Sequence, residues 1–263
     1  MTGSGEVGRL LELDHPAHGV ARVTLQRPEA RNALNTPLRC ELYDVFRQLD
    51  SDELVRCVIV RGSHGHFAAG ADLKEVAEMG PQAVSQLPVL KTWKAISELS
   101  KPLIAAVDGP ALGGGCELAQ HADIILAGRS ARFGQPEVNV GIMPGGGATQ
   151  RLVRALGYWR AMHLMLTGDP ITADEAFQIG LVSEVVPDES LEQRSIEMAS
   201  KIASRPPIAI RLIKQVALAG ADASLEAGLL LERRAFESLF DTKDQKEGMR
   251  AFAERRSPVF TGQ

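Results

Sequence analysis

The sequence predicts an α/β protein with a helical C-terminal third, and two observations support this fold class. Over roughly the first 190 residues, short apolar runs typical of buried strands alternate with amphipathic helical segments. After about residue 188 the strand pattern ends and only helical patterns follow. We therefore divide the chain into a core of residues 1–190 and a helical region of residues 191–263.

The first expected element is an antiparallel hairpin over residues 10–25, where two apolar stretches flank a turn-rich segment that contains Pro16. A helix should follow. Thr36 and Pro37 provide an N-cap and a first-turn proline, and apolar residues then recur at helical spacing as far as Leu49. The apolar stripe predicts that this helix packs against a core.

Three strands are expected next, at residues 57–60, 103–107 and 123–126, because each is a short apolar run of the kind found in a buried sheet. A long helical pattern covers roughly residues 81–99, and Lys101 and Pro102 end it before the next strand.

The helical region is expected to hold three helices, separated by residues 206–207 and by residues 219–222. Its apolar side chains are too many for one small helical unit to bury. They are Leu212, Val216, Leu225, Leu229, Leu231, Phe236 and Phe240. We therefore expect this region to pack on the core or on another subunit.

Composition narrows the classes of function. The 263 residues include 29 Lys or Arg and 33 Asp or Glu, which gives a net charge of −4 and no basic stripe, so no nucleic-acid partner is expected. No apolar run reaches the ~18 residues of a membrane span, and residues 1–9 show no signal segment. Three cysteines cannot all pair, which favours a reducing compartment, and we expect the cytoplasm.

Two glycine-rich segments are candidates for an anion site. FAAGADLK at residues 67–74 and GPALGGGCEL at residues 109–118 each join a predicted strand to a helix start. Small residues leave backbone N–H groups accessible there, and the first turn of a helix has unpaired donors. One such segment alone could simply permit a tight turn and close packing. Two that face each other could bind a single anionic oxygen.

Two glutamates accompany these segments. Glu117 lies in the first turn of the helix after the triple glycine, and Glu137 lies 20 residues further on, after Pro136 and before another glycine-rich loop. Together in a dry pocket, one carboxyl would keep its proton and the other would ionise, as addition or removal of water requires. Taken singly, Glu117 could be a helix-dipole partner and Glu137 a solvated loop residue.

Three longer segments together resemble the enoyl-CoA hydratase/isomerase (crotonase) superfamily: FAAGADLKE, PLIAAVDGPALGGGCELAQHADI and ARFGQPEVNVGIMPGGGATQRL. RPEARNAL, GLVSEVV and DTKDQKEGMRAF extend the resemblance over nearly the whole chain. The resemblance implies a crotonase-like spiral of ββα units with a C-terminal helical region, assembled as a homotrimer or a dimer of trimers. It also implies acyl-CoA thioester substrates, no metal and no cofactor apart from the CoA of the substrate, and a place in fatty-acid metabolism such as β-oxidation.

The resemblance also assigns roles within the site. The backbone N–H groups of Ala71 and Gly114 would form an oxyanion hole for the thioester carbonyl. Glu117 and Glu137 occupy both positions at which hydratases of this family carry catalytic glutamates. This implies an enoyl-CoA hydratase, which adds water in syn fashion to a trans-2-enoyl-CoA and yields a 3-hydroxyacyl-CoA. Gly145 corresponds to a glycine whose backbone supports the site.

Residues for CoA binding are also implied by the resemblance. Those within one subunit are Ala30, Arg31, Ala69, Asp72, Leu73 and Lys74, and those that would reach the CoA of a neighbouring subunit are Phe236 and Arg255. Lys74 has a physical motive as a point contact to phosphates, although a solvated helix lysine would look the same. Ala148 departs from the family pattern, where a glycine is common.

Other interpretations of the function remain open. Double-bond isomerisation or another acyl-CoA reaction could use the same oxyanion hole, and a non-catalytic CoA-binding protein could retain the fold. His64 and His66 lack further ligands at metal-binding spacing and are interpreted as part of a turn. Cys116 has no base partner in sequence and is interpreted as a packing residue.

Overall fold

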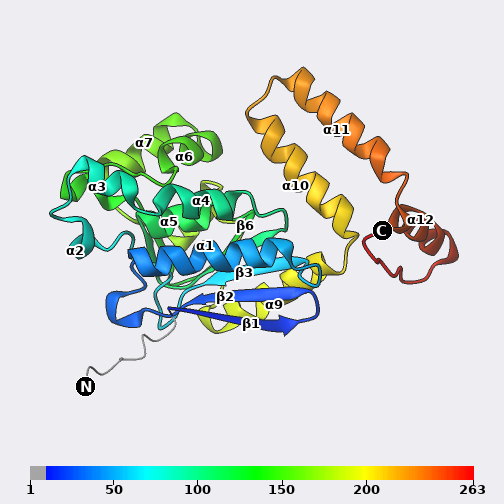
Figure 1. Ribbon diagram of the computed structural model, residues 1–263, viewed down its shortest axis with the longest axis horizontal. Coiled ribbons are helices and arrows are strands. Elements are labelled where there is room, and N and C mark those ends of the chain that lie inside the picture. The colour runs from blue at the N-terminus through cyan, green and yellow to red at the C-terminus, as the bar shows by residue number, and fades with distance from the viewer. Residues whose placement is uncertain (1–9) are drawn as a thin grey trace.

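The computed structural model describes residues 10–263. The expectation that residues 1–9 form no signal segment concerns residues outside this range. A six-stranded sheet in the order β1-β2-β3-β4-β6-β9 forms its centre (Figure 1). Its strands are β1 (Leu11–Ala17), β2 (Val20–Leu25), β3 (Cys57–Arg61), β4 (Leu103–Val107), β6 (Ile124–Gly128) and β9 (Glu184–Val186). The β1–β2 pair is the expected antiparallel hairpin, and every other pairing in this sheet is parallel.

A smaller sheet joins β5 (Pro110–Leu112), β7 (Arg132–Gly134) and β8 (Ile171–Thr172). A parallel bridge between Ala68 and Ala111 extends it by one residue. Three successive passages of the chain therefore cross the large sheet, then the small one, and then enter a helix: α2 (Leu73–Val76), α5 (Gly114–Gln120) or the 3₁₀ helix η2 (Pro136–Val140). This confirms the spiral of ββα units.

Both faces of the large sheet are buried, which explains why its strands are nearly continuous apolar runs. On one face, Val58 and Val60 of β3 belong to a core shared with α1 (Thr36–Ser51) and α4 (Val89–Ser97). On the other face, Cys57 and Ile59 belong to a core shared with α9 (Leu191–Ala203).

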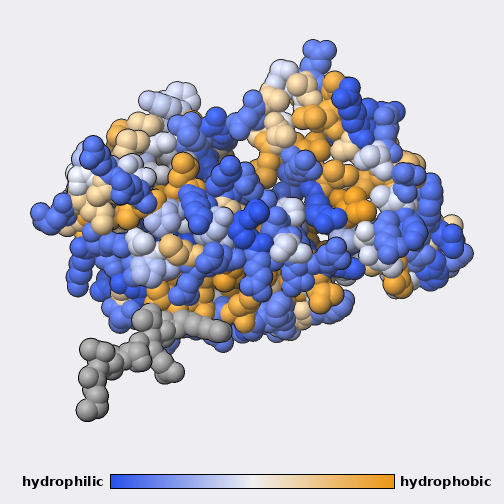
Figure 2. Space-filling model, viewed as in Figure 1, coloured by the Kyte–Doolittle hydropathy of each residue, from blue (hydrophilic) through white to orange (hydrophobic). Residues whose placement is uncertain are grey.

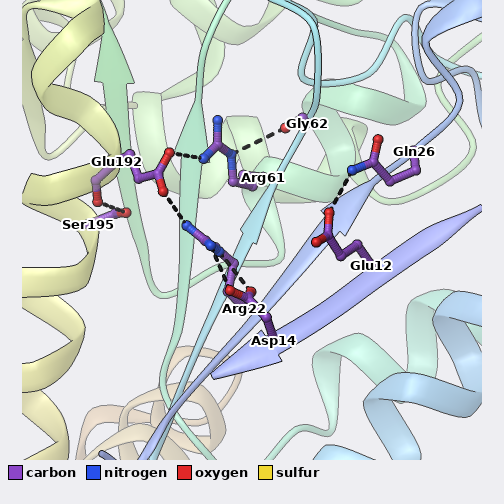
Figure 3. A network of polar contacts seen from close by, with 8 residues as sticks. All are labelled: Glu12, Asp14, Arg22, Gln26, Arg61, Gly62, Glu192 and Ser195. Carbon is purple, nitrogen blue, oxygen red and sulfur yellow. Dashed lines mark hydrogen bonds and ion pairs between the residues drawn. The ribbon is translucent and has the colours of Figure 1, made fainter. Parts of the chain in front are cut away.

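Ion pairs fasten α9 to the sheet. Glu192 accepts hydrogen bonds at 2.6 Å from both Arg22 of β2 and Arg61 of β3, and Arg22 also pairs with Asp14 of β1 (Figure 3). Three later helices project from the rest of the structure, and we call them the arm (Figure 1). They are α10 (Pro207–Ala221), α11 (Leu225–Leu239) and α12 (Lys243–Glu254). The division of the chain at residue 190 stays a prediction. The helix α9, which this division assigns to the helical region, packs against the large sheet.

The remaining helices complete the body. They are η1 (Pro28–Ala30), α3 (Pro81–Gln86), α6 (Ala148–Leu156), α7 (Tyr158–Thr167), α8 (Ala173–Gln178) and η3 (Asp188–Ser190). Within residues 10–263, no helix has both the length and the apolar character needed to cross a membrane.

Three details differ from the expected elements. Asn35, not Thr36, caps α1, since its side chain accepts from the Leu38 N–H. The helix expected over residues 81–99 is split into α3 and α4, because Leu87 takes an extended backbone conformation before Pro88. Four helices, not three, follow residue 188, because Thr242 caps α12 and ends the continuous pattern.

Candidate active site

Two backbone N–H groups, those of Ala71 and Gly114, lie side by side at the starts of neighbouring helices. A Cβ added to Gly114 would lie 3.6 Å from the Ala71 nitrogen. Within residues 10–263, neither N–H donates a hydrogen bond to the protein. Gly70 and Gly113, which precede them, have φ values of 105° and 49°, conformations that favour glycine. The backbone therefore leaves a pair of donors free for one ligand oxygen, as the sequence predicts.

Glu117 lies on α5 and is only 3% exposed. Its Oε1 accepts hydrogen bonds from the N–H groups of Gly146 at 2.6 Å and of Ala148 at 3.1 Å. Burial raises the pKa of Glu117, while these N–H groups and the nearby Arg39 oppose that rise. The carboxyl group is thus enclosed and held in one orientation.

An aromatic pair braces this carboxyl group. His121 stacks on Trp93 with ring centroids 5.0 Å apart and an interplanar angle of 12°. The Nε2 of His121 lies 3.1 Å from the Gly146 carbonyl oxygen, which can only accept, so Nε2 carries the proton. Burial lowers the pKa of His121 to about 3, and the ring is therefore neutral. Gly146 is held on both sides, by Glu117 through its N–H and by His121 through its carbonyl.

Glu137 lies in η2 and is half-buried. With its amide nitrogen turned toward Glu137, Gln135 donates to both carboxylate oxygens, at 3.0 and 3.2 Å, and accepts from Gln120. Burial, with a further contribution from the charge of Glu117, raises the pKa of Glu137 to about 7. A Cβ added to Gly113 would lie 2.9 Å from the Oε1 of Glu137, so this carboxyl group lies next to the free donors.

The four groups together can move a proton next to a carbonyl. A carbonyl oxygen placed between Ala71 and Gly114 would be stabilised as it gains negative charge. At neutral pH a carboxyl with a pKa of about 7 is present in both protonated and ionised forms, so Glu137 can donate a proton. Glu117, anchored by two N–H groups, suits the role of base. This combination supports addition or removal of water, or movement of a double bond, beside an enolate.

The segments predicted to bind CoA within one subunit are brought together. The Ala69 N–H donates to the Arg31 carbonyl oxygen at 3.0 Å, which joins the end of η1 to the strand before α2. Asp72 pairs with Arg27 at 2.7 Å and also caps α2 by accepting from the N–H of Lys74. Ala30 and Arg31 lie at the end of η1, and Leu73 and Lys74 are exposed at the start of α2, so the two segments lie near each other at the surface.

The predicted roles of three other residues stay predictions. Phe236 lies on α11 and Arg255 directly follows α12, at the opposite end of the structure from α2 (Figure 1). Gly145 is exposed, and the N–H that contacts Glu117 belongs to Gly146, the next residue. Ala148 departs from the family pattern without loss of the local contact, because its N–H also reaches Glu117.

Several residues of the site were not found from the sequence: Arg39, His121, Gln135 and Gly146. His121 follows Glu117 by four residues, so helical spacing places it on the same face of α5, and this signal was available. Arg39 interrupts the apolar side of α1, as a charge among buried leucines. We find no comparable local signal for Gln135 or Gly146.

The other candidate chemistries gain no support. Cys116 is buried, and this burial raises the pKa of its thiol to about 12, which agrees with a packing residue. Residues 10–263 contain no group of three or more His, Cys, Asp or Glu side chains that could hold a metal ion.

Comparisons with known proteins agree with this geometry. A family model described as enoyl-CoA hydratase/isomerase matches residues 16–263. A probable mitochondrial enoyl-CoA hydratase of Dictyostelium discoideum is 46% identical over 241 residues, which cover 92% of this chain and 87% of that protein. A 2,3-dehydroadipyl-CoA hydratase of Escherichia coli (strain K12) is 43% identical over 92% of this chain and 95% of its own length. A crystal structure of enoyl-CoA hydratase from Bacillus anthracis has a TM-score of 0.94 at 40% identity and covers 97% of this chain and 100% of that one.

Proposed function

Because the chain belongs to the enoyl-CoA hydratase/isomerase family, we propose that it is an enoyl-CoA hydratase that adds water to a trans-2-enoyl-CoA and yields a 3-hydroxyacyl-CoA. One observation carries the choice of reaction within the family. Two glutamates in unlike environments, Glu117 anchored by two N–H groups and Glu137 with a pKa of about 7, lie beside the same pair of free donors. Hydration needs a base and an acid, and both are present.

The mechanism follows from these positions. The thioester oxygen accepts hydrogen bonds from the N–H groups of Ala71 and Gly114, which withdraws electrons from the conjugated double bond. Glu117 removes a proton from a water molecule while the water oxygen bonds to the β-carbon. The electron pair of the double bond then moves toward the thioester oxygen. Glu137 then gives its proton to the α-carbon. Syn addition requires that both glutamates act on one face of the substrate.

We propose that the CoA binds beside η1 and the start of α2. Backbone groups of Ala30, Arg31 and Ala69 would contact the adenine end, and Lys74 offers a positive charge to the phosphates. Asp72 and Leu73 complete this segment, and the ion pair of Asp72 with Arg27 keeps it in place. CoA enters as part of the substrate, and the proposed reaction uses no separate cofactor and no metal.

The arm supports a proposal of assembly as a homotrimer or a dimer of trimers. An apolar groove of about 550 Å³ runs between α10 and α11, and apolar side chains gather there (Figure 2). Leu225, which lines it, is 79% exposed, and Ile213 and Phe236 are also exposed. Covering such a surface with another subunit would stabilise it, and would bring Phe236 and Arg255 toward a neighbouring CoA. The cytoplasmic location expected from the sequence stays a prediction.

Loss of absorbance at the conjugated thioester band of crotonyl-CoA tests the proposed reaction, with a longer 2-enoyl-CoA and a Glu137→Gln variant alongside. Rapid loss with the wild type and almost none with the variant would support hydration. Faster conversion of a 3-enoyl-CoA than hydration of a 2-enoyl-CoA would identify an isomerase. Tight binding of CoA thioesters without turnover of either substrate would identify a non-catalytic CoA-binding protein.

A further inference from the structure

Arg39 is a buried arginine without an anionic partner at ion-pair distance in residues 10–263. It lies on α1 and is only 6% exposed. Its Nε donates to the Leu34 carbonyl oxygen at 3.3 Å, and its Nη1 is enclosed without an acceptor. Burial of an incompletely paired charge is costly, and burial lowers the pKa of Arg39. A group that weakens the fold in this way is a candidate for a functional role.

Arg39 lies beside the free backbone donors and contacts Trp93, which borders the buried glutamate. A Cβ added to Gly114 would lie 3.8 Å from the Nη2 of Arg39. The guanidinium lies over the Trp93 ring, 5.4 Å from its centroid. Trp93 in turn borders Glu117, since its Nε1 and the Oε2 of Glu117 lie 2.7 and 2.5 Å from the position that a Cβ would take on Gly146.

Four other charged or titratable groups lie near this position. His121, on α5 with Glu117, is neutral because its pKa is about 3. Glu137 of η2 cannot stabilise a second negative charge. Arg151 of α6 is a second cation that interacts with Glu117, and it donates to the Gln120 carbonyl and the Ser97 hydroxyl at 3.4 Å. Of the two cations, Arg39 is the one among the main influences on the pKa of Glu117.

Glu75 of α2 also interacts electrostatically with Arg39. Its carboxylate accepts from the Thr36 N–H at 3.0 and 3.2 Å, and its charge favours the protonated guanidinium. Glu75 therefore helps to keep Arg39 charged, and Arg39 acts on Glu117 in the direction that lowers the pKa of that carboxyl.

We propose that Arg39 is a positioning residue for the hydration reaction, whose buried positive charge keeps the Glu117 carboxylate ionised so that it can accept a proton from water. Within residues 10–263 no hydrogen bond or ion pair joins Arg39 to Glu117, so Arg39 acts on this carboxyl through its electric field. The inference rests on the proposed function, because it gives Glu117 the role of base. It adds a cation to the site that the glutamates and backbone donors do not provide.

The test compares Arg39→Met, which removes the charge at similar volume, with Arg39→Lys, which retains it, and with Arg39→Gln as a second neutral variant. Without the charge, the pKa of Glu117 should rise by about one unit or more, and the acidic limb of the kcat profile should move up by the same amount. The ratio of variant to wild-type kcat should thus fall toward about 0.1 at the acidic end of the profile and approach 1 at its alkaline end for both neutral variants. KM should change less than about threefold.

Two controls separate this role from a structural one. Arg39→Lys should follow the wild-type pH profile, and Arg39→Met should have a Tm at least equal to that of the wild type, because an incompletely paired buried charge has been removed. A variant-to-wild-type ratio that stays constant with pH, or an effect confined to KM, would overturn the proposal. So would a matched loss of Tm and kcat in all three variants.

Absence of hydration by the wild type would count against the proposed function alone. The inference would then be tested directly by ¹³C NMR titration of glutamate-labelled protein, with the Glu117 signal assigned through a Glu117→Gln variant. A higher pKa of Glu117 in Arg39→Met than in the wild type is the expected result. An unchanged titration would overturn the role of Arg39.

Discussion

The backbone N–H of Gly146 donates a hydrogen bond to the Oε1 of Glu117 at 2.6 Å, across 29 residues of sequence. The carbonyl of the same glycine lies 3.1 Å from His121, four residues beyond Glu117 on α5. One residue of the loop before α6 therefore contacts both the carboxyl proposed as the base and the helix that carries it. The geometry of the base depends on a backbone that leaves no room for a side chain at this position.

Replacement of Gly146 by alanine should disable the site without unfolding the protein. The added Cβ would lie 2.5 Å from the Oε2 of Glu117 and 2.7 Å from the Nε1 of Trp93, so at least one side chain must move. We expect kcat to fall roughly 100-fold or more, since proton transfer depends on position. Gly80→Ala is the control, because no atom lies within 4 Å of its added Cβ. Equal kcat values for the two variants would contradict the role of Gly146.

Glu137→Gln should lower kcat by roughly 10²- to 10⁴-fold, because the amide cannot give a proton to the α-carbon. Binding should persist, since the variant keeps the N–H groups of Ala71 and Gly114 and the segments proposed to bind CoA. Steady-state kinetics and calorimetric titration with a 3-hydroxyacyl-CoA measure the two effects separately. Near-normal kcat in this variant would show that Glu137 is not the acid.

The pH dependence of kcat should have an alkaline limb set by Glu137. This residue must be protonated to act as the acid, and its pKa is raised to about 7, chiefly by burial. We therefore expect kcat for hydration to decline as the pH rises through about 7. Coupling to Glu117 means that the observed value belongs to the pair. A profile that stays flat to about pH 9 would be inconsistent with this assignment, provided that hydration itself limits kcat.

The same pKa predicts that folding stability, like kcat, falls as the pH rises. The folded state holds a proton on Glu137 up to about pH 7, whereas an unfolded glutamate releases it near 4.5, so folding stability falls as the pH rises through this window. Glu137→Gln removes that dependence. The Tm of the variant relative to the wild type should therefore increase between about pH 5 and pH 8. Thermal unfolding measured by circular dichroism at both pH values tests this, and a constant difference would be evidence against the raised pKa.

The proposed assembly predicts that a charge in the groove of the arm dissociates the oligomer. Leu225→Glu places a carboxylate among the apolar residues that line the groove between α10 and α11, where another subunit would bury it. We expect light scattering to give a trimer or hexamer mass for the wild type and a smaller mass for the variant. Leu54→Glu is a matched control, since Leu54 is 80% exposed and lies outside the arm. A monomeric wild type would refute the proposal.

Much of this molecule could be predicted from local patterns in the sequence. Short apolar runs predicted the hairpin and the three central strands, and apolar residues at helical spacing predicted α1, because both patterns depend only on nearby residues. The glycine-rich segments predicted two free backbone donors, and the structure places Ala71 and Gly114 next to each other. The two glutamates and the family resemblance followed from motifs of the same short range.

Tertiary structure alone decided how these groups behave. The raised pKa of Glu137 arises from burial and from a charge 20 residues away in sequence, and the anchor of Glu117 comes from Gly146, not from Gly145. Arg39 joins the site only because α1 packs beside α4 and the start of α5. Desolvation and Coulomb interactions depend on distance in space, which the order of residues does not state. The sequence thus identified the candidate reacting groups, and the fold determined their pKa values and their orientation.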